Sequence, residues 1–248
     1  MLDYGQHGGL PPHDVVKLPT GGIFYKSKKK SIRVGYLTAS DENLLMATDG
    51  LGQEGIVISL LKQKIFEQDL RPDELMDGDI QAILIFLRNT AFGPEYSFKL
   101  TDPETDKEFA ANVLLDELNI KKGEYQPDEN GVFETILPKS NKKVKLKPLN
   151  YGQQVELDKL AQTYPVGRIA PKQTWRLNKM IVEIDGNSEP GYIALEVEKL
   201  PISDSKYIKK FIDENEPRLD LTKRVIAPSG KEVIVNITFG VEFFRPFF

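Results

Sequence analysis

The chain of 248 residues is 40% hydrophobic and 28% charged, and its formal net charge is −4. This composition is typical of a folded globular protein, and so small a negative charge gives no general attraction to nucleic acid or to anionic lipid. The absence of cysteine excludes disulfide bonds and thiol chemistry. Because no apolar run has the length of a membrane span and no signal-peptide pattern is present, we expect no membrane segment.

Residues 1–17 contain several Gly and Pro residues and show no hydrophobic periodicity. We therefore predict a flexible N-terminal arm over this range, which becomes ordered only against a partner protein. The candidate partner-binding side chains of the arm are Tyr4, Leu10 and Val15. The only histidines of the chain, His7 and His13, also lie here, and without further ligands at a suitable spacing they do not predict a metal site.

Regular patterns begin at Leu18. From there to Thr38 the sequence alternates around a Gly-containing turn and a Lys-rich tip, which predicts a β-hairpin with Ile32 and Val34 facing the core. Ser40, followed by two acidic residues, is typical of a helix start.

Apolar residues then recur at helical spacing in two segments. The stripe residues are Val57, Leu60, Leu61 and Ile65 in the first segment and Ile80, Ile83, Leu84 and Leu87 in the second. The second segment is the clearest helix of the chain, because Asp77 or Asp79 provides an N-terminal carboxylate and Gly93 followed by Pro provides an end.

Two segments read as strand, Pro-containing turn and strand. They are "LTDPETDKEFAANVLL" at residues 100–115 and "VIAPSGKEVIVNITF" at residues 225–239. Each predicts a ribbon-like β-hairpin.

The order of these elements repeats along the chain. "KSIRVGYLT" aligns with "KKVKLKPLN", "ELMDGDIQAILIFL" aligns with "KLPISDSKYIKKFI", and the two ribbon segments align with each other. The alignment places Asp79 on Asp204 and Ile83 on Ile208, with the apolar faces in phase. We predict an α+β fold of two sequence-related modules, at residues 18–122 and 123–248. Each module has a β-hairpin, two or three helices and a closing β-hairpin.

Several of these stretches resemble the baseplate hub assembly proteins of T-even-type contractile-tail phages. They include "LPTGGIFY", "RVGYLTASDENLL" and "LMDGDIQAILIFLRNTAFGPEYSF" in the first half, with "LPISDSKYIKKFIDENEPRLDL", "VIAPSGKEV" and the terminal "FFRPFF" in the second. The resemblance implies a structural component or assembly factor of the baseplate hub. Its partners would be other baseplate or hub proteins, and its location the virion tail baseplate, after assembly in the host cytoplasm.

Relatives of this kind can carry Cys pairs that suggest zinc ribbons. Here the two turns read Asp-Pro-Glu-Thr from Asp102 and Ala-Pro-Ser-Gly from Ala227, which do not provide a tetrahedral nitrogen and sulfur site. We therefore expect both closing ribbons to be metal-free.

Enzyme signatures are missing from the sequence. It has no P-loop, no nucleophile-elbow motif and no metalloprotease motif, and both histidines lie in the predicted arm. Asp77 and Asp79 are explained by helix capping more simply than by glycoside chemistry. We expect no enzyme activity, no cofactor and no small-molecule substrate.

Two Lys-rich runs, at residues 26–30 and 141–147, raise the alternative of a nucleic-acid-binding ribbon protein. We favour charged hairpin edges that prevent unwanted strand pairing, since no aromatic ladder accompanies the lysines. Five phenylalanines lie in the last ten residues. Phe239 and Phe243 fit the core, whereas Phe244, Phe247 and Phe248 are predicted to bind a partner.

Overall fold

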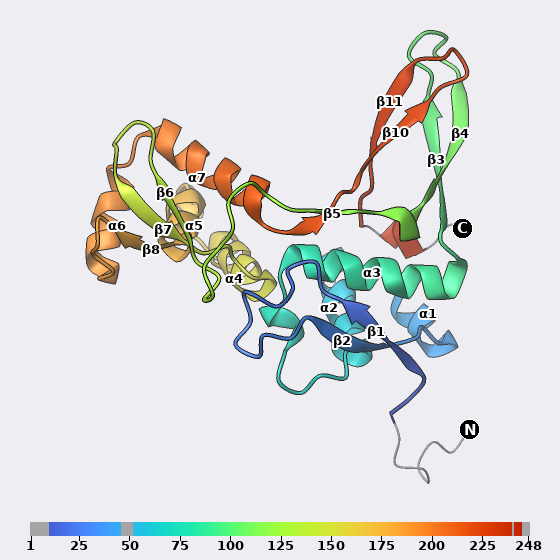
Figure 1. The fold of residues 1–248 in the computed structure, drawn as a ribbon, viewed down its shortest axis with the longest axis horizontal. Helices are drawn as coiled ribbons and strands as arrows, with labels where there is room; N and C mark the ends of the chain where they lie inside the picture. The colour runs from blue at the N-terminus through green and yellow to red at the C-terminus, as the bar shows by residue number, and fades with distance from the viewer. Residues whose placement is uncertain (1–9, 46–51, 240, 245–248) are drawn as a thin grey trace.

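The structure, a computed structural model, describes residues 10–45, 52–239 and 241–244, and its α+β class confirms the prediction from the sequence. The helices are α1 (Ala39–Leu45), α2 (Gly52–Lys64), α3 (Asp77–Phe92), α4 (Tyr151–Gln162), α5 (Lys172–Met180), α6 (Pro190–Glu198) and α7 (Ile202–Asn215). Short 3-10 turns are η1 (Pro72–Glu74), η2 (Leu115–Glu117) and η3 (Val241–Phe244). The strands form small antiparallel sheets (Figure 1).

The first hairpin pairs β1 (His13–Lys17) with β2 (Ser31–Gly35). Ile32 and Val34 are buried, as predicted. The pairing strand β1, however, lies inside the predicted flexible arm, so that prediction is wrong for His13–Lys17. The physical reason is that Val16 lies opposite Ile32 in the strand register and buries its side chain in the core. The strand has only five residues, which is too short for its alternation to be visible in the sequence.

Helix α3 is the central helix of the first module. Its predicted stripe, from Ile80 to Leu87, is buried, and the helix ends at Gly93, whose φ of 80° suits a residue without a Cβ. Asp77 and Asp79 lie in the first turn, where the positive end of the helix dipole favours negatively charged side chains.

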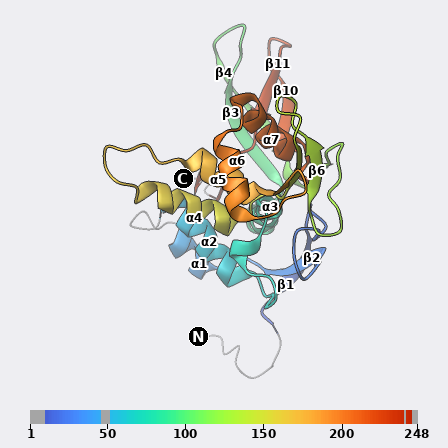
Figure 2. The same ribbon diagram turned by 90° about the vertical axis from the view of Figure 1, so that its left-hand side faces the viewer.

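The second module forms a three-stranded sheet of β6 (Phe133–Ile136), β7 (Lys143–Leu146) and β8 (Ile181–Ile184). Four helices, α4 to α7, accompany it, where the sequence predicted two or three. Figure 2 shows these helices toward the viewer, and the loop between α4 and α5 extends away from the other elements. The first module has three described helices, α1 to α3, so the second has one helix more.

The two modules share one buried hydrogen-bonding device. Asp79 in the first turn of α3 accepts hydrogen bonds from the N–H and hydroxyl of Thr20, at 3.0 and 2.6 Å. Asp204 in the first turn of α7 accepts hydrogen bonds from the N–H groups of Lys139 and Ser140, at 2.8 and 2.9 Å. In each case the donors lie in the loop of the module's first hairpin, immediately after a Leu-Pro pair. The shared device supports the duplication that we infer from the sequence.

The closing hairpins of both modules lie side by side (Figures 1 and 2). The first pairs β3 (Glu95–Thr101) with β4 (Glu108–Leu114), and the second pairs β10 (Thr222–Ile226) with β11 (Glu232–Asn236). Both were predicted from the sequence. Together they project from the helical body, and we call them the two-ribbon prong.

The chain crosses between the modules along two paired strands. β5 (Ile120–Lys121) leads from the first ribbon to the second module, and β9 (Arg218–Leu219) leads back to the second ribbon. Gly123 follows β5 and packs directly on Asn215, where a Cβ would lie 2.1 Å from the Asn215 Cα. The Asn215 side chain also accepts a hydrogen bond from Tyr125 N–H. This junction is therefore tightly packed, and the division at residues 122 and 123 stays our interpretation.

Candidate docking surfaces

The tips of the two ribbons are joined by one carboxylate. Asp102, which is 1% exposed, accepts hydrogen bonds from the N–H and hydroxyl of Ser229, at 2.9 and 2.7 Å. It also accepts one from Glu104 N–H within its own turn. Desolvation acts to raise the pKa of Asp102, but these hydrogen bonds outweigh it and hold the pKa below its ordinary value.

The turns that begin at Asp102 and Ala227 thus hold a polar contact between the ribbons. Among the described residues, no group of three or more His, Cys, Asp or Glu side chains is placed to bind a metal ion. The sequence shows Asp102 and Ser229 as turn residues, but it gives no signal that they meet, because they lie 127 positions apart.

Each ribbon has one covered and one open face. Ala111, Val113 and Val235 are buried on the covered faces. On the open face of the second ribbon, Ile226 and Ile234 are 65% and 62% exposed. Arg224 lies directly opposite Ile234 in the strand register, and Glu232 lies opposite Ile226. The open face therefore presents an apolar pair bordered by one cation and one carboxylate, a composition suited to protein contact.

An aromatic cluster supports the base of the prong. The ring of Phe243 contacts those of Tyr96, Phe239 and Phe244, with centroid distances of 5.4, 4.8 and 5.2 Å. The guanidinium of Arg88 lies 4.8 Å from the centroid of the Tyr96 ring. Arg88 also donates hydrogen bonds to the carbonyls of Gly93 and Glu95, which fixes the start of β3 on the end of α3.

This cluster corrects one predicted docking residue. Phe244 is 4% exposed and stacks edge to face on Phe243, so its side chain belongs to the core and is not presented to a partner. The reason is that a 3-10 turn, η3, stands here in place of an extended strand and packs Phe244 on Phe243, which strand alternation in the sequence does not reveal. The core positions predicted for Phe239 and Phe243 agree with the structure, with Phe243 fully buried and Phe239 half-buried.

The remaining predicted docking residues are only partly placed. Tyr4, Phe247 and Phe248 lie outside the described residues. Leu10 and Val15 are 47% and 59% exposed, and their contact with a partner stays a prediction.

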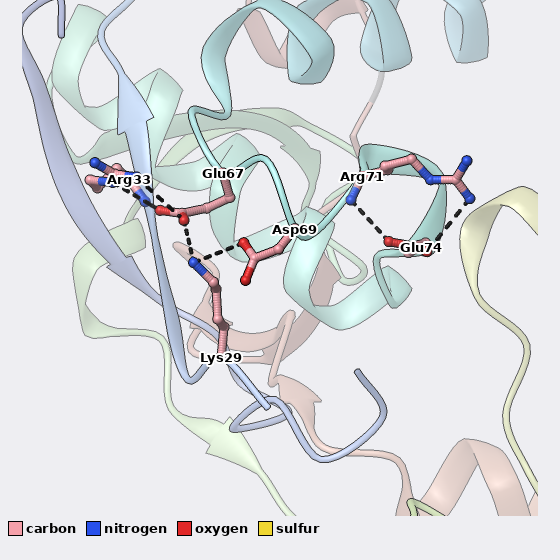
Figure 3. A network of polar contacts seen from close by, with 6 residues as sticks. All are labelled: Lys29, Arg33, Glu67, Asp69, Arg71 and Glu74. Carbon is pink, nitrogen blue, oxygen red and sulfur yellow. Dashed lines mark hydrogen bonds and ion pairs between the residues drawn. The ribbon is translucent and has the colours of Figure 1, made fainter. Parts of the chain in front are cut away.

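In the first Lys-rich run, residues 26–30, one lysine, Lys29, is paired with carboxylates. Glu67, between α2 and η1, accepts hydrogen bonds from Lys29 at 2.5 Å and from Arg33 Nε at 3.0 Å (Figure 3). The Lys29 Nζ also lies 2.9 Å from an Asp69 carboxylate oxygen. In the same view, Arg71 forms an ion pair with Glu74. These contacts, with that of Arg33 the strongest, lower the pKa of Glu67 to about 2.

In the second Lys-rich run, residues 141–147, three lysines are paired with carboxylates. Its ion pairs are Lys142 with Glu196 at 2.5 Å, Lys143 with Glu134 at 2.6 Å and Lys145 with Glu183 at 2.8 Å. These ion pairs neutralise most of the second run, which reduces the positive charge that it could offer to nucleic acid.

A polar cavity of about 370 Å³ lies where α3, α4, α5 and α7 meet. Its charged lining residues are Asp77, Arg176, Lys209, Asp213, Glu216 and Arg218. Burial raises the pKa of Glu216 to about 8, and the negative charge of Asp77 adds to the shift. No hydroxyl, thiol or imidazole side chain is among the described residues of the lining, so the cavity offers no nucleophile of these types.

The family assignment comes from comparison with known proteins. A family model described as T4 bacteriophage base plate protein matches residues 22–245, most of the chain. Comparisons with curated proteins and with solved structures gave no match. Among the described helices, none has both the length and the apolar character needed to cross a bilayer. The chain therefore belongs to the T4 bacteriophage base plate protein family, which makes it a structural protein of a phage tail baseplate.

Proposed function

We propose that the chain is a component or assembly factor of the baseplate hub and acts by docking other baseplate proteins onto the two-ribbon prong. The observation that carries the proposal is the open face of the second ribbon, where Ile226 and Ile234 are exposed on a projecting element held rigid at its tip and base. Family membership supports the general role, and the resemblance of the sequence to hub assembly proteins supports the hub.

The energetics of such a contact are adequate. Each isoleucine that becomes fully buried contributes about 1.5–3 kcal/mol, so the pair is sufficient to anchor an interface. The Asp102 contact joins the ribbons before binding, so less conformational entropy is lost on docking. Such a function needs shape and apolar surface but no reaction chemistry.

The test replaces both isoleucines with aspartate in the cells that produce the particle. The Ile226→Asp, Ile234→Asp variant should fold normally. Its amount in purified baseplates, measured by quantitative mass spectrometry, should be at least tenfold lower than that of the wild type. Ile202→Asp is the matched control, because Ile202 is 76% exposed on α7 and far from the prong along the chain. Normal incorporation of the double variant would exclude docking through this face.

The same measurement separates the two roles within the proposal. A hub component remains in the purified particle at fixed stoichiometry. An assembly factor is present in assembly intermediates and absent from the finished particle.

A further inference from the structure

The loop that joins α4 to α5, residues 163–171, exposes two aliphatic side chains completely. Val166 is 104% exposed and Ile169 is 95% exposed. Figure 2 shows this loop extending away from the rest of the fold. A single exposed aliphatic residue is ordinary, but two such residues three positions apart on one projecting loop form a local apolar surface.

Two defined turns shape the loop. Arg168 N–H donates to Pro165 O at 3.1 Å, and Gly167 between them has a φ of 83°, as a type II turn requires at its third position. Lys172 N–H donates to Ala170 O at 2.8 Å across Pro171, whose φ of −80° and ψ of 49° are those of an inverse γ-turn. The exposed side chains therefore stand on an ordered backbone.

Both ends of the loop are also tied to the neighbouring helices. The Tyr164 ring stacks edge to face on Trp175 of α5, with centroids 5.6 Å apart. Lys172 at the start of α5 forms an ion pair with Asp158 of α4. A loop fixed at both ends and shaped by turns loses little conformational entropy when it binds.

The charge around the loop indicates what it would bind. Arg168 lies between the two aliphatic residues, is exposed, and forms no ion pair with any residue that the structure describes. Lys159, in the last turn of α4, is exposed nearby in the sequence. Arginine is enriched among the energetically important residues of protein contacts, and its natural counterpart is a carboxylate.

We propose that this loop is a preformed docking element for another baseplate protein, one whose surface has an apolar pocket bordered by Asp or Glu side chains. Val166 and Ile169 would fill the pocket, and Arg168 would pair with its acidic border. The inference rests on the proposed docking function for the kind of partner. It uses a surface separate from the two-ribbon prong, so variants of the loop and of the prong test the two proposals independently.

The first experiment places a photo-crosslinking amino acid at Val166 in particle-producing cells and identifies the crosslinked peptide by mass spectrometry. The same residue at Ile202 is the control for exposed positions in general. The crosslink at Val166 should map to one baseplate protein, beside apolar and acidic residues. Crosslinks to a second copy of this chain, or the same products from Val166 and Ile202, would overturn the proposal.

The second experiment measures affinity for that partner and, in parallel, incorporation into particles. The Val166→Ser, Ile169→Ser variant should melt normally, bind at least tenfold more weakly and be depleted from particles. The matched control is Leu195→Ser, Ile202→Ser, because these residues are 58% and 76% exposed on α6 and α7. Wild-type incorporation of the loop variant would overturn the proposal even if no crosslink forms.

Two single variants test the stated chemistry. Arg168→Glu should weaken binding about tenfold, and a Lys in place of the partner's crosslinked acidic residue should restore part of the loss. Gly167→Ala should weaken binding several-fold, because alanine is strained at the positive φ of the turn. Unchanged binding by Arg168→Glu would exclude the acidic border.

Discussion

Asp102 at the tip of the first ribbon holds Ser229 at the tip of the second through two hydrogen bonds, to its N–H at 2.9 Å and its hydroxyl at 2.7 Å. The carboxylate makes these hydrogen bonds charge-assisted. Among the described residues, each ribbon is a separate two-stranded sheet, with no third strand beside it. An isolated two-stranded hairpin is marginally stable in water, so the contact should determine whether the ribbons stay together.

The first prediction is that Asp102→Ala separates the ribbon tips. Because the chain has no cysteine, Lys107→Cys with Lys231→Cys allows spin labels to be attached at two exposed sites only, one on each ribbon. Pulsed electron resonance should give a narrow distance distribution for the labelled parent and a broad one after Asp102→Ala. Glu104→Ala, an exposed neighbour in the same turn, should leave the distribution narrow. A narrow distribution in both variants would contradict the role of Asp102.

The same contact should depend on pH. The pKa of Asp102 is lowered in the folded protein, so its stabilising contribution is complete above the ordinary Asp pKa near 4 and is lost as the pH falls through the lowered value. The labelled parent should therefore show broadening in acid. Asp102→Asn, which cannot titrate, should show the same distribution across that range.

A second prediction concerns Glu67, whose pKa of about 2 reflects hydrogen bonds from Arg33 and Lys29. A carboxyl group whose pKa is lowered on folding stabilises the folded protein at any pH above its pKa in the unfolded chain, here about 4.5. This stabilisation is lost as the pH falls from about 4.5 to 2. Because Lys29 and Arg33 are 30% and 43% exposed, screening reduces the contribution to roughly 1 kcal/mol at neutral pH. Denaturant unfolding of Glu67→Gln should show this loss at pH 7 and almost none near pH 2. An equal loss at both values would refute the ionic origin.

Glu216 should behave in the opposite way. Burial and the nearby Asp77 raise its pKa to about 8, so the folded protein favours the protonated acid. The ionised Glu216 carboxylate destabilises the folded protein. This destabilisation is absent below about pH 4.5, grows as the pH rises, and is complete above pH 8. Glu216→Gln should therefore stabilise the protein by on the order of 1 kcal/mol at pH 9 and change little at pH 4. The control is Glu214→Gln, on an exposed side chain of the same helix, which should show no gain at pH 9.

The last prediction distinguishes core from docking phenylalanines near the C-terminus. Phe244→Ala should lower the free energy of unfolding by about 3–5 kcal/mol, because its side chain is 4% exposed within the aromatic cluster. The Phe247→Ala, Phe248→Ala variant should melt like the wild type but incorporate poorly into baseplates, if those two residues bind a partner. Thermal unfolding and particle incorporation, measured on both variants, test each assignment. A large fall in melting temperature for the double variant would place these residues in the core.

The sequence alone determined the elements whose signals are local. The stripe of α3 and the two closing hairpins follow from periodicity and turn chemistry, which act over a few residues. The alternation around Ile32 and Val34 likewise indicated a buried strand face.

Only the tertiary structure decided the features that join distant residues. The strand His13–Lys17 is ordered by pairing with β2, Phe244 is buried against Phe243 in η3, and the ribbon tips meet through Asp102 and Ser229. Lys29 and Lys142 are paired with carboxylates of other elements, Glu67 and Glu196. Each of these depends on the path of the backbone through space, which hydrophobic periodicity in a single sequence does not reveal.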